Sequence, residues 1–131
     1  MQKLVCSSCP YPVSAALVQL LNVELERHTS DSIILNYRDP GYSATTGGFH
    51  PVEIHIEDGV IQYITDFAYY GRGDMAELAK ELDFNFIQGD FEQMGAVHPA
   101  SAGGELFSLW QANFLAYVEM KVFTLTVELL D

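Results

Sequence analysis

The side chains most capable of chemistry gather between residues 39 and 50 and on the strand patterns beside this stretch. The stretch combines two glycine-rich turns with several hydroxyl groups and ends in a histidine. A connection this long without secondary structure of its own is usually functional or mobile. The candidate residues are Arg38, Asp39, Tyr42, Ser43, His50, Glu53 and Asp66. They could bind a polar ligand, but we favour the interpretation that they satisfy the backbone of an ordered loop packed over the end of a sheet.

A metal centre is one chemical alternative, with His50, Glu53, His55 and Asp66 as its ligands. Imidazole and carboxylate groups suit zinc or iron. On a continuous strand, however, His50 and His55 would point to opposite faces, because they are five positions apart. We therefore predict no metal and no cofactor.

A nucleophilic serine is another alternative, in which Ser43 is activated by His50 and an acid such as Asp39 or Asp66. Ser43 does not lie in the G-x-S-x-G pattern of a nucleophile elbow. We therefore predict no catalytic residue. Arg38 is expected to be structural and to pair with a carboxylate such as Asp66.

The two cysteines, Cys6 and Cys9, form a C-x-x-C pair ahead of a Pro-Tyr-Pro segment. A redox pair of this kind belongs at the start of a helix that follows a strand, and the sequence shows no such context. A structural zinc site needs four ligands, and there is no second pair to complete it. We predict two reduced thiols on a flexible N-terminal arm, residues 1–11.

Length, composition and charge exclude several classes of protein. The 131 residues predict one domain, which we place at residues 12–131. With 18 acidic and 6 basic residues, the net charge of −12 argues against binding to nucleic acid or to an anionic membrane surface. The uncharged stretch 4–23 is broken by Pro10 and Pro12, so it suits neither a spanning helix nor a signal peptide. A cytoplasmic location follows as the expectation.

Two amphipathic helices are predicted. The first begins after Ser14, a good N-cap residue, and ends near Arg27 and His28. The second contains Trp110, and its apolar stripe is read as Leu106, Leu109, Trp110, Phe114, Tyr117 and Val118. This aromatic stripe indicates core packing rather than a cofactor site.

The first strands are predicted at 32–38, 52–57 and 60–69. Pro40 and Gly41 predict a type II turn after the first strand, and Asp58-Gly59 predicts a type I′ hairpin between the other two. Unbroken register in this hairpin would place one set of side chains on a common face: Val52, Ile54, Ile56, Ile61, Tyr63 and Thr65.

The second half of the chain alternates between helix and strand signals. Asp74 and Glu77 resemble a capping box that would open a short helix reaching Glu81. A strand or strand pair follows through the phenylalanines at 84, 86 and 91, with a turn at Gly89-Asp90, and 97–104 is predicted to be loop. The segment 121–129 reads as a strand. Short connections favour an antiparallel sheet, so the predicted fold class is α+β.

Several long strings of the sequence carry a family resemblance: NYRDPGYSATTGGFHPVEI (36–54), YITDFAYYG (63–71), ELAKELDFNF (77–86) and ELFSLWQANFLAYVEMKVF (105–123). They resemble an uncharacterised bacterial family, known as a domain of unknown function, from marine gammaproteobacterial genomic and pathogenicity islands. The resemblance spans residues 12–127 and leaves both cysteines outside. It implies similarity in fold to the acidic mitochondrial matrix protein that binds complement heads: a twisted antiparallel sheet flanked by α-helices, with no defined catalytic residues.

Three hypotheses for function remain. The first is an acidic interaction module that binds a basic surface of a protein partner and self-associates. The second is a small metal-dependent or hydrolytic enzyme that uses the loop 39–50 and the adjacent hairpin. The third is a mimic of DNA, which would need carboxylates aligned on one face. The absence of a coherent catalytic set favours the first.

Overall fold

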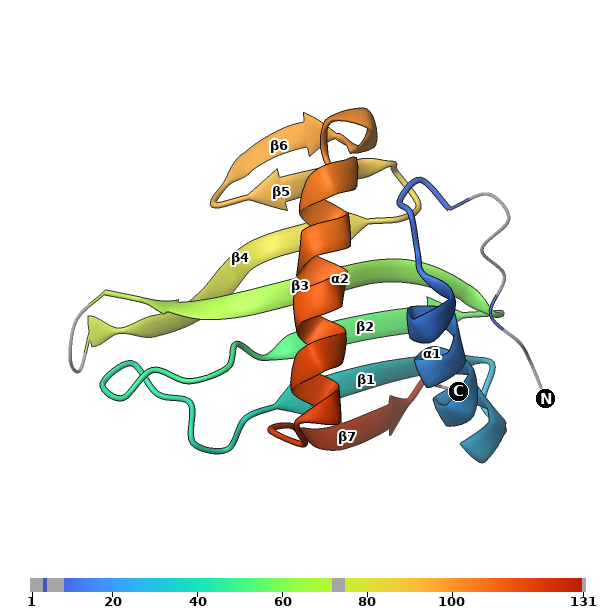
Figure 1. Ribbon diagram of the computed structural model, residues 1–131, viewed down its shortest axis with the longest axis horizontal. Coiled ribbons are helices and arrows are strands. Elements are labelled where there is room, and N and C mark those ends of the chain that lie inside the picture. Colours follow the sequence, from blue (N-terminus) through green and yellow to red (C-terminus); the bar gives the residue numbers. More distant parts are fainter. Residues whose placement is uncertain (1–3, 5–8, 72–74, 131) are drawn as a thin grey trace.

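Two helices cover one face of a seven-stranded antiparallel sheet in the computed structural model (Figure 1), which describes residues 4, 9–71 and 75–130. The elements are α1 (Ala15–Arg27), β1 (Ser32–Arg38), β2 (Val52–Glu57), β3 (Val60–Tyr70), β4 (Glu77–Asn85), β5 (Asp90–Gln93), β6 (Ala96–Pro99), a short 3-10 helix (Ala100–Ala102), α2 (Gly104–Glu119) and β7 (Thr124–Leu129). The strands lie in the order β6-β5-β4-β3-β2-β1-β7. The predicted α+β class with an antiparallel sheet is confirmed.

The helix α1 forms where Ser14 predicts it. The Ser14 hydroxyl accepts a hydrogen bond from the backbone N–H of Leu17 at 3.2 Å, as an N-cap does. The start of α1 is also tied to α2, because the buried amide of Gln111 accepts from the Ser14 N–H and donates to the Pro12 carbonyl. Leucines at helical spacing then turn one side of α1 into the core.

The helix α2 crosses the whole sheet from the β6 edge to the β7 edge (Figure 1). Its buried side is formed by Phe107, Trp110, Gln111 and Phe114. The predicted stripe was therefore partly wrong, because Leu109 is 62% exposed whereas Phe107 is fully buried. The helix is apolar on several sides, so residue spacing alone does not determine which side meets the sheet.

Two residues of the predicted N-terminal arm pack into the core. The Tyr11 side chain is 3% exposed, lies 5.2 Å from the ring of Phe107 and donates its hydroxyl to the Asp90 carbonyl. Leu4 is also buried. The prediction of a flexible arm over 1–11 is therefore wrong for these two positions. Cys9 packs partly buried against the core, and Cys6 lies outside the described residues.

The hairpin of β2 and β3 is confirmed, but its register changes along its length. Asp58 and Gly59 both adopt positive φ, as a type I′ turn requires. Ile56 pairs with Ile61, yet His55 pairs with Tyr63, so Gln62 is an extra residue on β3. This β-bulge moves Tyr63 and Thr65 to the face opposite the core, contrary to the unbroken register predicted, and brings Ile64 into the core.

The predicted helix reaching Glu81 is wrong where the structure describes it, because Glu77–Asn85 forms β4 and pairs with β3. Asp74 lies outside the described residues. The local sequence favours a helix, but pairing along the long strand β3 overrides that propensity. Between the pairs Asp66–Leu82 and Phe67–Lys80, Glu81 has no partner on β3, so it occupies a second β-bulge.

The strands β5 and β6 complete one edge of the sheet. The predicted strand pair with a turn near Gly89 is confirmed as β4 and β5. The loop predicted at 97–104 is wrong over its first residues, which belong to β6. The connection between β5 and β6 is formed by Met94 and Gly95, both with positive φ. Methionine at the first of these positions gives no sequence signal for such a turn. The last predicted strand is confirmed as β7.

Candidate functional site

A cavity of about 270 Å³ lies where the loop 39–50, the sheet and α2 meet. Polar groups on its wall come from all three: His50 from the loop, Asp66 and Glu81 from β3 and β4, and Trp110, Asn113 and Tyr117 from α2. The rest of the lining is mainly apolar and aromatic. A mostly apolar cavity with a few convergent polar groups is the usual form of a small-ligand site.

The loop is ordered by its own side chains. The Asp39 carboxylate accepts from the Gly41 N–H at 2.8 Å and from the Phe49 N–H at 3.0 Å, so it holds both ends of the loop together. Gly41 does not adopt the positive φ of a type II turn, and that prediction is wrong. The aspartate bonding to the backbone two residues ahead stabilises this turn instead. Ser43 bonds with Thr46 in the loop tip.

His50 stands at the end of the loop and turns toward two carboxylates. Its Nδ1 lies 3.1 Å from Oδ1 of Asp66 and 3.6 Å from Oε2 of Glu81. The ring of Tyr42 lies 5.3 Å from the imidazole, and the Tyr42 hydroxyl accepts from the Tyr69 N–H. The loop therefore fixes the position of His50 through backbone and aromatic contacts.

Asp66 is the most buried member of this group, with 13% of its side chain exposed. Its Oδ2 accepts a hydrogen bond from Trp110 Nε1 at 2.9 Å, which leaves Oδ1 to face His50. Burial raises the pKa of Asp66 above its usual value, although Trp110 and His50 act in the opposite direction. A raised pKa in a cavity wall is a feature of functional carboxylates.

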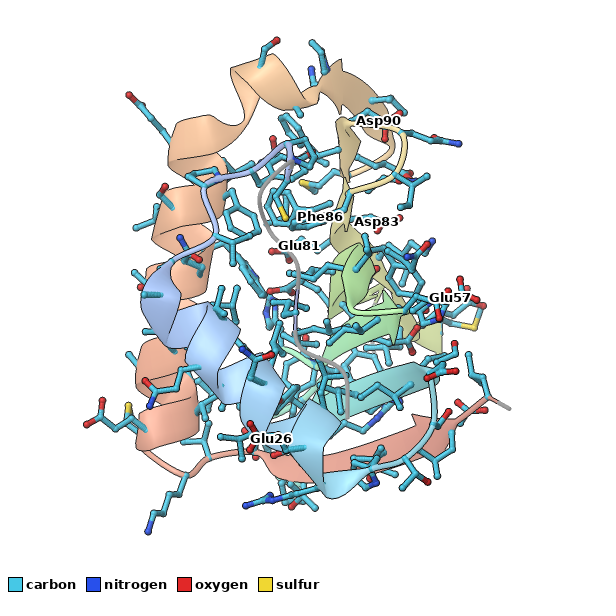
Figure 2. All side chains as sticks on the ribbon, turned by 90° about the vertical axis from the view of Figure 1, so that its right-hand side faces the viewer. Glu26, Glu57, Glu81, Asp83, Phe86 and Asp90 are labelled. Atoms are coloured by element: carbon cyan, nitrogen blue, oxygen red, sulfur yellow. The ribbon has the colours of Figure 1, made fainter. Side chains whose placement is uncertain are left out.

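Glu81 reaches the cavity because of the β-bulge in β4. Strict alternation would place it beside Asp83 on the face away from the helices. The extra residue turns Glu81 and Leu82 to the same side, and Figure 2 shows Glu81 between the sheet and the helices. Bulges often re-aim a side chain next to a functional site. Sequence reasoning missed Glu81, because register within the folded sheet creates the bulge.

The predicted candidates fall into separate places. Asp39, Tyr42, His50 and Asp66 come together at the loop and cavity. Glu53 and His55 point to the opposite face of the sheet, where the Tyr63 hydroxyl donates to Glu53 and His55 contacts Ser32 and Tyr63. Arg38 is exposed at the end of β1, and Asp66 pairs with His50 rather than with Arg38. Ser43 bonds within the loop tip and not to His50.

A buried hydroxyl lies near the same group. The hydroxyl of Tyr70, on β3, is buried and has no hydrogen-bond partner among the residues that the structure describes. Desolvation raises the pKa of Tyr70, and the charges of Glu81 and Asp66 raise it further. A hydroxyl without a described partner therefore lies close enough to Glu81 and Asp66 to feel their charges.

The sheet face opposite the helices, here called the open face, carries two rows of side chains in cross-strand register. From β7 to β6, the first row is Thr126, Asn36, Glu53, Thr65, Asp83, Glu92 and Val97, and the second is Glu128, Ile34, His55, Tyr63, Asn85, Asp90 and Pro99. Glu57 lies on the same face beside Ser32. Figure 2 shows Glu57 and Asp83 on the side of the sheet away from α1 and α2.

The elevated pKa of Asp66 predicts how stability changes with pH. The folded protein holds this proton more tightly than the unfolded chain does, so ionising Asp66 costs more in the folded state. The contribution of Asp66 to stability is complete when the pH is below 3.8, the ordinary pKa of an aspartate. This contribution declines as the pH rises through the raised pKa of the folded state. We expect Asp66→Asn to remove this decline, which cannot exceed about 1.4 kcal/mol per pH unit.

Urea unfolding of the wild type and Asp66→Asn at pH 4, 5, 6 and 7 measures this effect. The free energy of unfolding of the wild type, minus that of the variant, should fall as the pH rises. Asparagine can still accept from Trp110 Nε1, so the variant keeps this hydrogen bond while it removes the charge. A difference that grows with pH would contradict the predicted sign.

The structure contains no helix, within the part of the chain that it describes, with the length and apolar character to cross a membrane.

Comparison with known proteins places the chain in a family. A model for proteins of unknown function, DUF2787, matches residues 12–128, nearly all of the predicted domain. A comparison with curated proteins gives no match.

Two solved structures from Vibrio cholerae are similar to the chain. A conserved hypothetical protein from pathogenicity island VPI-2 is 39% identical with a TM-score of 0.81, covering 93% of this chain and 98% of its own. It is described as sharing structural homology with the human P32 protein. A hypothetical protein from the VSP-II pathogenicity island is 37% identical with a TM-score of 0.80 and the same coverage. The expected bacterial family and its fold are confirmed, and the chain belongs to the DUF2787 family of proteins of unknown function.

Proposed function

We propose that the protein is a cytoplasmic interaction module whose open face binds a basic surface of a partner protein. The observation that carries this proposal is the alignment of carboxylates on the face of the sheet opposite α1 and α2. Within the described strands, six acidic residues share it: Glu53, Glu57, Asp83, Asp90, Glu92 and Glu128. Charge on a continuous face attracts opposite charge and orients its approach.

The placement of these carboxylates costs stability. Asp83 and Glu92 stand directly opposite each other on β4 and β5, and like charges in such pairs destabilise a sheet. Lys80 offsets part of this repulsion, with its Nζ 3.3 Å from an Asp83 oxygen. The Thr65 hydroxyl also donates to Asp83. A basic partner would relieve the remaining repulsion on binding.

The enzyme hypothesis receives less support, because its residues do not share one site. His50 and Asp66 line the cavity, whereas Glu53 and His55 lie on the open face. Ser43 is engaged in the loop tip. Self-association stays a prediction.

A matched pair of triple variants tests the role of the open face. In Glu53→Gln/Asp83→Asn/Glu92→Gln the three substitutions lie in one cross-strand row, and each amide keeps an acceptor oxygen for the hydrogen bonds described. The control, Glu26→Gln/Glu105→Gln/Glu119→Gln, removes three exposed carboxylates from the helices. Both variants change the net charge from −12 to −9.

The probe is a lysine- and arginine-rich peptide of about 15 residues, long enough to span such a sheet at roughly 4.8 Å per strand. Fluorescence anisotropy measures its binding at 50 and 500 mM salt. At about 0.5–1 kcal/mol per exposed charge pair, the open-face variant should bind about 10- to 100-fold more weakly. The control should bind the peptide about as tightly as the wild type does. High salt should weaken peptide binding to the wild type, the open-face variant and the control.

Equal losses in both variants would show that net charge alone attracts the peptide and would overturn the proposal. Binding that does not respond to salt would also overturn it.

A further inference from the structure

We propose that His50, Asp66 and Glu81 form a binding site for a divalent first-row transition-metal ion, of which Zn²⁺ is the representative, on the wall of the cavity. From the sequence we predicted no metal, and the metal alternative had a different set of ligands. The structure separates Glu53 and His55 from His50 and replaces them with Glu81, the residue that the β-bulge turns inward. This site lies on the other side of the sheet from the open face and is independent of its proposed role.

The distances between the donor atoms suit a bound ion. A nitrogen or oxygen ligand lies roughly 2.0–2.2 Å from zinc, so two ligands of one ion are roughly 3.0 Å apart at a right angle and 3.4 Å apart at the tetrahedral angle. His50 Nδ1 is 3.1 Å from the Asp66 oxygen and 3.6 Å from the Glu81 oxygen. All three donor atoms lie within 4.8 Å of one another. Small side-chain adjustments would bring them around one ion.

The donor set indicates the class of ion. One imidazole and two carboxylates favour zinc, manganese or iron(II), whereas magnesium and calcium prefer oxygen ligands alone. Zinc sites with three protein ligands keep a position for water or another molecule. The cavity beside the three ligands offers room for such a group, and Asn113 and Tyr117 also line it.

Surrounding groups already hold the ligands in place. Trp110 Nε1 donates to Oδ2 of Asp66, which directs Oδ1 toward His50. Hydrogen bonds of this kind orient the ligands of metal centres. On β4, the backbone carbonyl of Glu81 accepts from the Met94 N–H at 3.0 Å, which anchors the bulged residue.

An ion pair without a metal is the competing interpretation. Protonated His50 between Asp66 and Glu81 would satisfy the same three side chains. A metal site would bind Zn²⁺ stoichiometrically, and this binding would depend on each of the three ligands. A simple ion pair would show no such binding. Binding experiments therefore distinguish the two.

Isothermal titration of the metal-free protein with ZnCl₂ at pH 7 is the primary test. We expect one ion per chain, and with CoCl₂ we expect visible absorption bands from a coordinated cobalt ion. MgCl₂ should compete only weakly. The titration is repeated with Cys6→Ser/Cys9→Ser, because thiolates also bind zinc. Stoichiometry at the proposed site should be unchanged in that variant.

Variants of the proposed ligands test whether these side chains bind the zinc ion. His50→Gln and Glu81→Gln should each weaken zinc binding by about 100-fold or more, since removing even a supporting group costs about 10- to 100-fold. Trp110→Phe should weaken it by about 10-fold by releasing Asp66. The controls are His55→Gln on the opposite face and Glu105→Gln at the start of α2, which should bind as the wild type does. Circular dichroism confirms that each variant is folded.

The proposal is overturned if the wild type binds no zinc, if binding disappears with the two cysteines, or if His50→Gln and Glu81→Gln bind zinc as tightly as the wild type.

Discussion

Replacing Phe84 with alanine should lower the free energy of unfolding by about 3–5 kcal/mol, the usual cost of removing a buried phenylalanine ring. Phe84 is fully buried at the centre of an aromatic cluster. Its ring lies 5.0 Å from Phe107, 5.3 Å from Tyr11 and 5.9 Å from Trp110. The substitution therefore leaves a void between β4, α2 and the segment before α1.

Urea unfolding followed by fluorescence measures this loss, since Trp110 is the only tryptophan and lies in the same cluster. The melting temperature should fall by about 10–20 °C. Ile87→Ala, three residues along and 61% exposed, is the control and should change stability by no more than about 0.5 kcal/mol. If Phe84→Ala does not fold, Phe84→Leu should show a smaller loss in the same direction. Equal stability of Phe84→Leu and the wild type would contradict the central role of this ring.

Gly48→Ala should lower the free energy of unfolding by about 2–4 kcal/mol, because it strains the backbone and breaks a hydrogen bond. Gly48 adopts a φ of +138°, a conformation that residues with a Cβ rarely adopt. An added Cβ would lie 2.8 Å from Asp39 Oδ2 and 3.0 Å from the Cα of Tyr42. Asp39 would have to move and release the Phe49 N–H.

Its neighbour Gly47 provides a matched control. Gly47 also has positive φ, at +70°, but an added Cβ would meet no atom within 4 Å. Gly47→Ala should therefore cost only about 1–2 kcal/mol, from the left-handed backbone alone. Hydrogen exchange gives a local measurement, because the Phe49 amide should exchange faster in Gly48→Ala than in Gly47→Ala. Similar exchange and similar stability in the two variants would show that crowding at Gly48 is unimportant.

Local signals in the sequence were sufficient for much of the fold. Ser14 marks the start of α1, and Asp58-Gly59 marks a tight hairpin, because both effects act within a few residues. The antiparallel class followed from the short connections between strand patterns. These inferences needed no knowledge of distant partners.

The errors arise where distant partners decide the structure. Residues 77–81 carry a helical sequence, but pairing with β3 makes them a strand. The bulges at Gln62 and Glu81 depend on how neighbouring strands align, so alternation in one strand cannot reveal them. Each bulge changes the face on which functional side chains lie. The sequence analysis therefore named two of the three side chains of this group, His50 and Asp66, and missed Glu81.

The pairing of β7 with β1 also affects how the chain folds. The register joins Ile33 to Leu129, so this edge of the sheet forms between segments from opposite ends of the sequence. Strands β1 to β6 are synthesised in the order in which they pair. The second partner of β1, β7, is synthesised only after α2. Until then the outer backbone groups of β1 are unpaired, and such an exposed edge is prone to join another chain. Once β7 has paired, β1 is an interior strand and β7 forms this edge of the sheet.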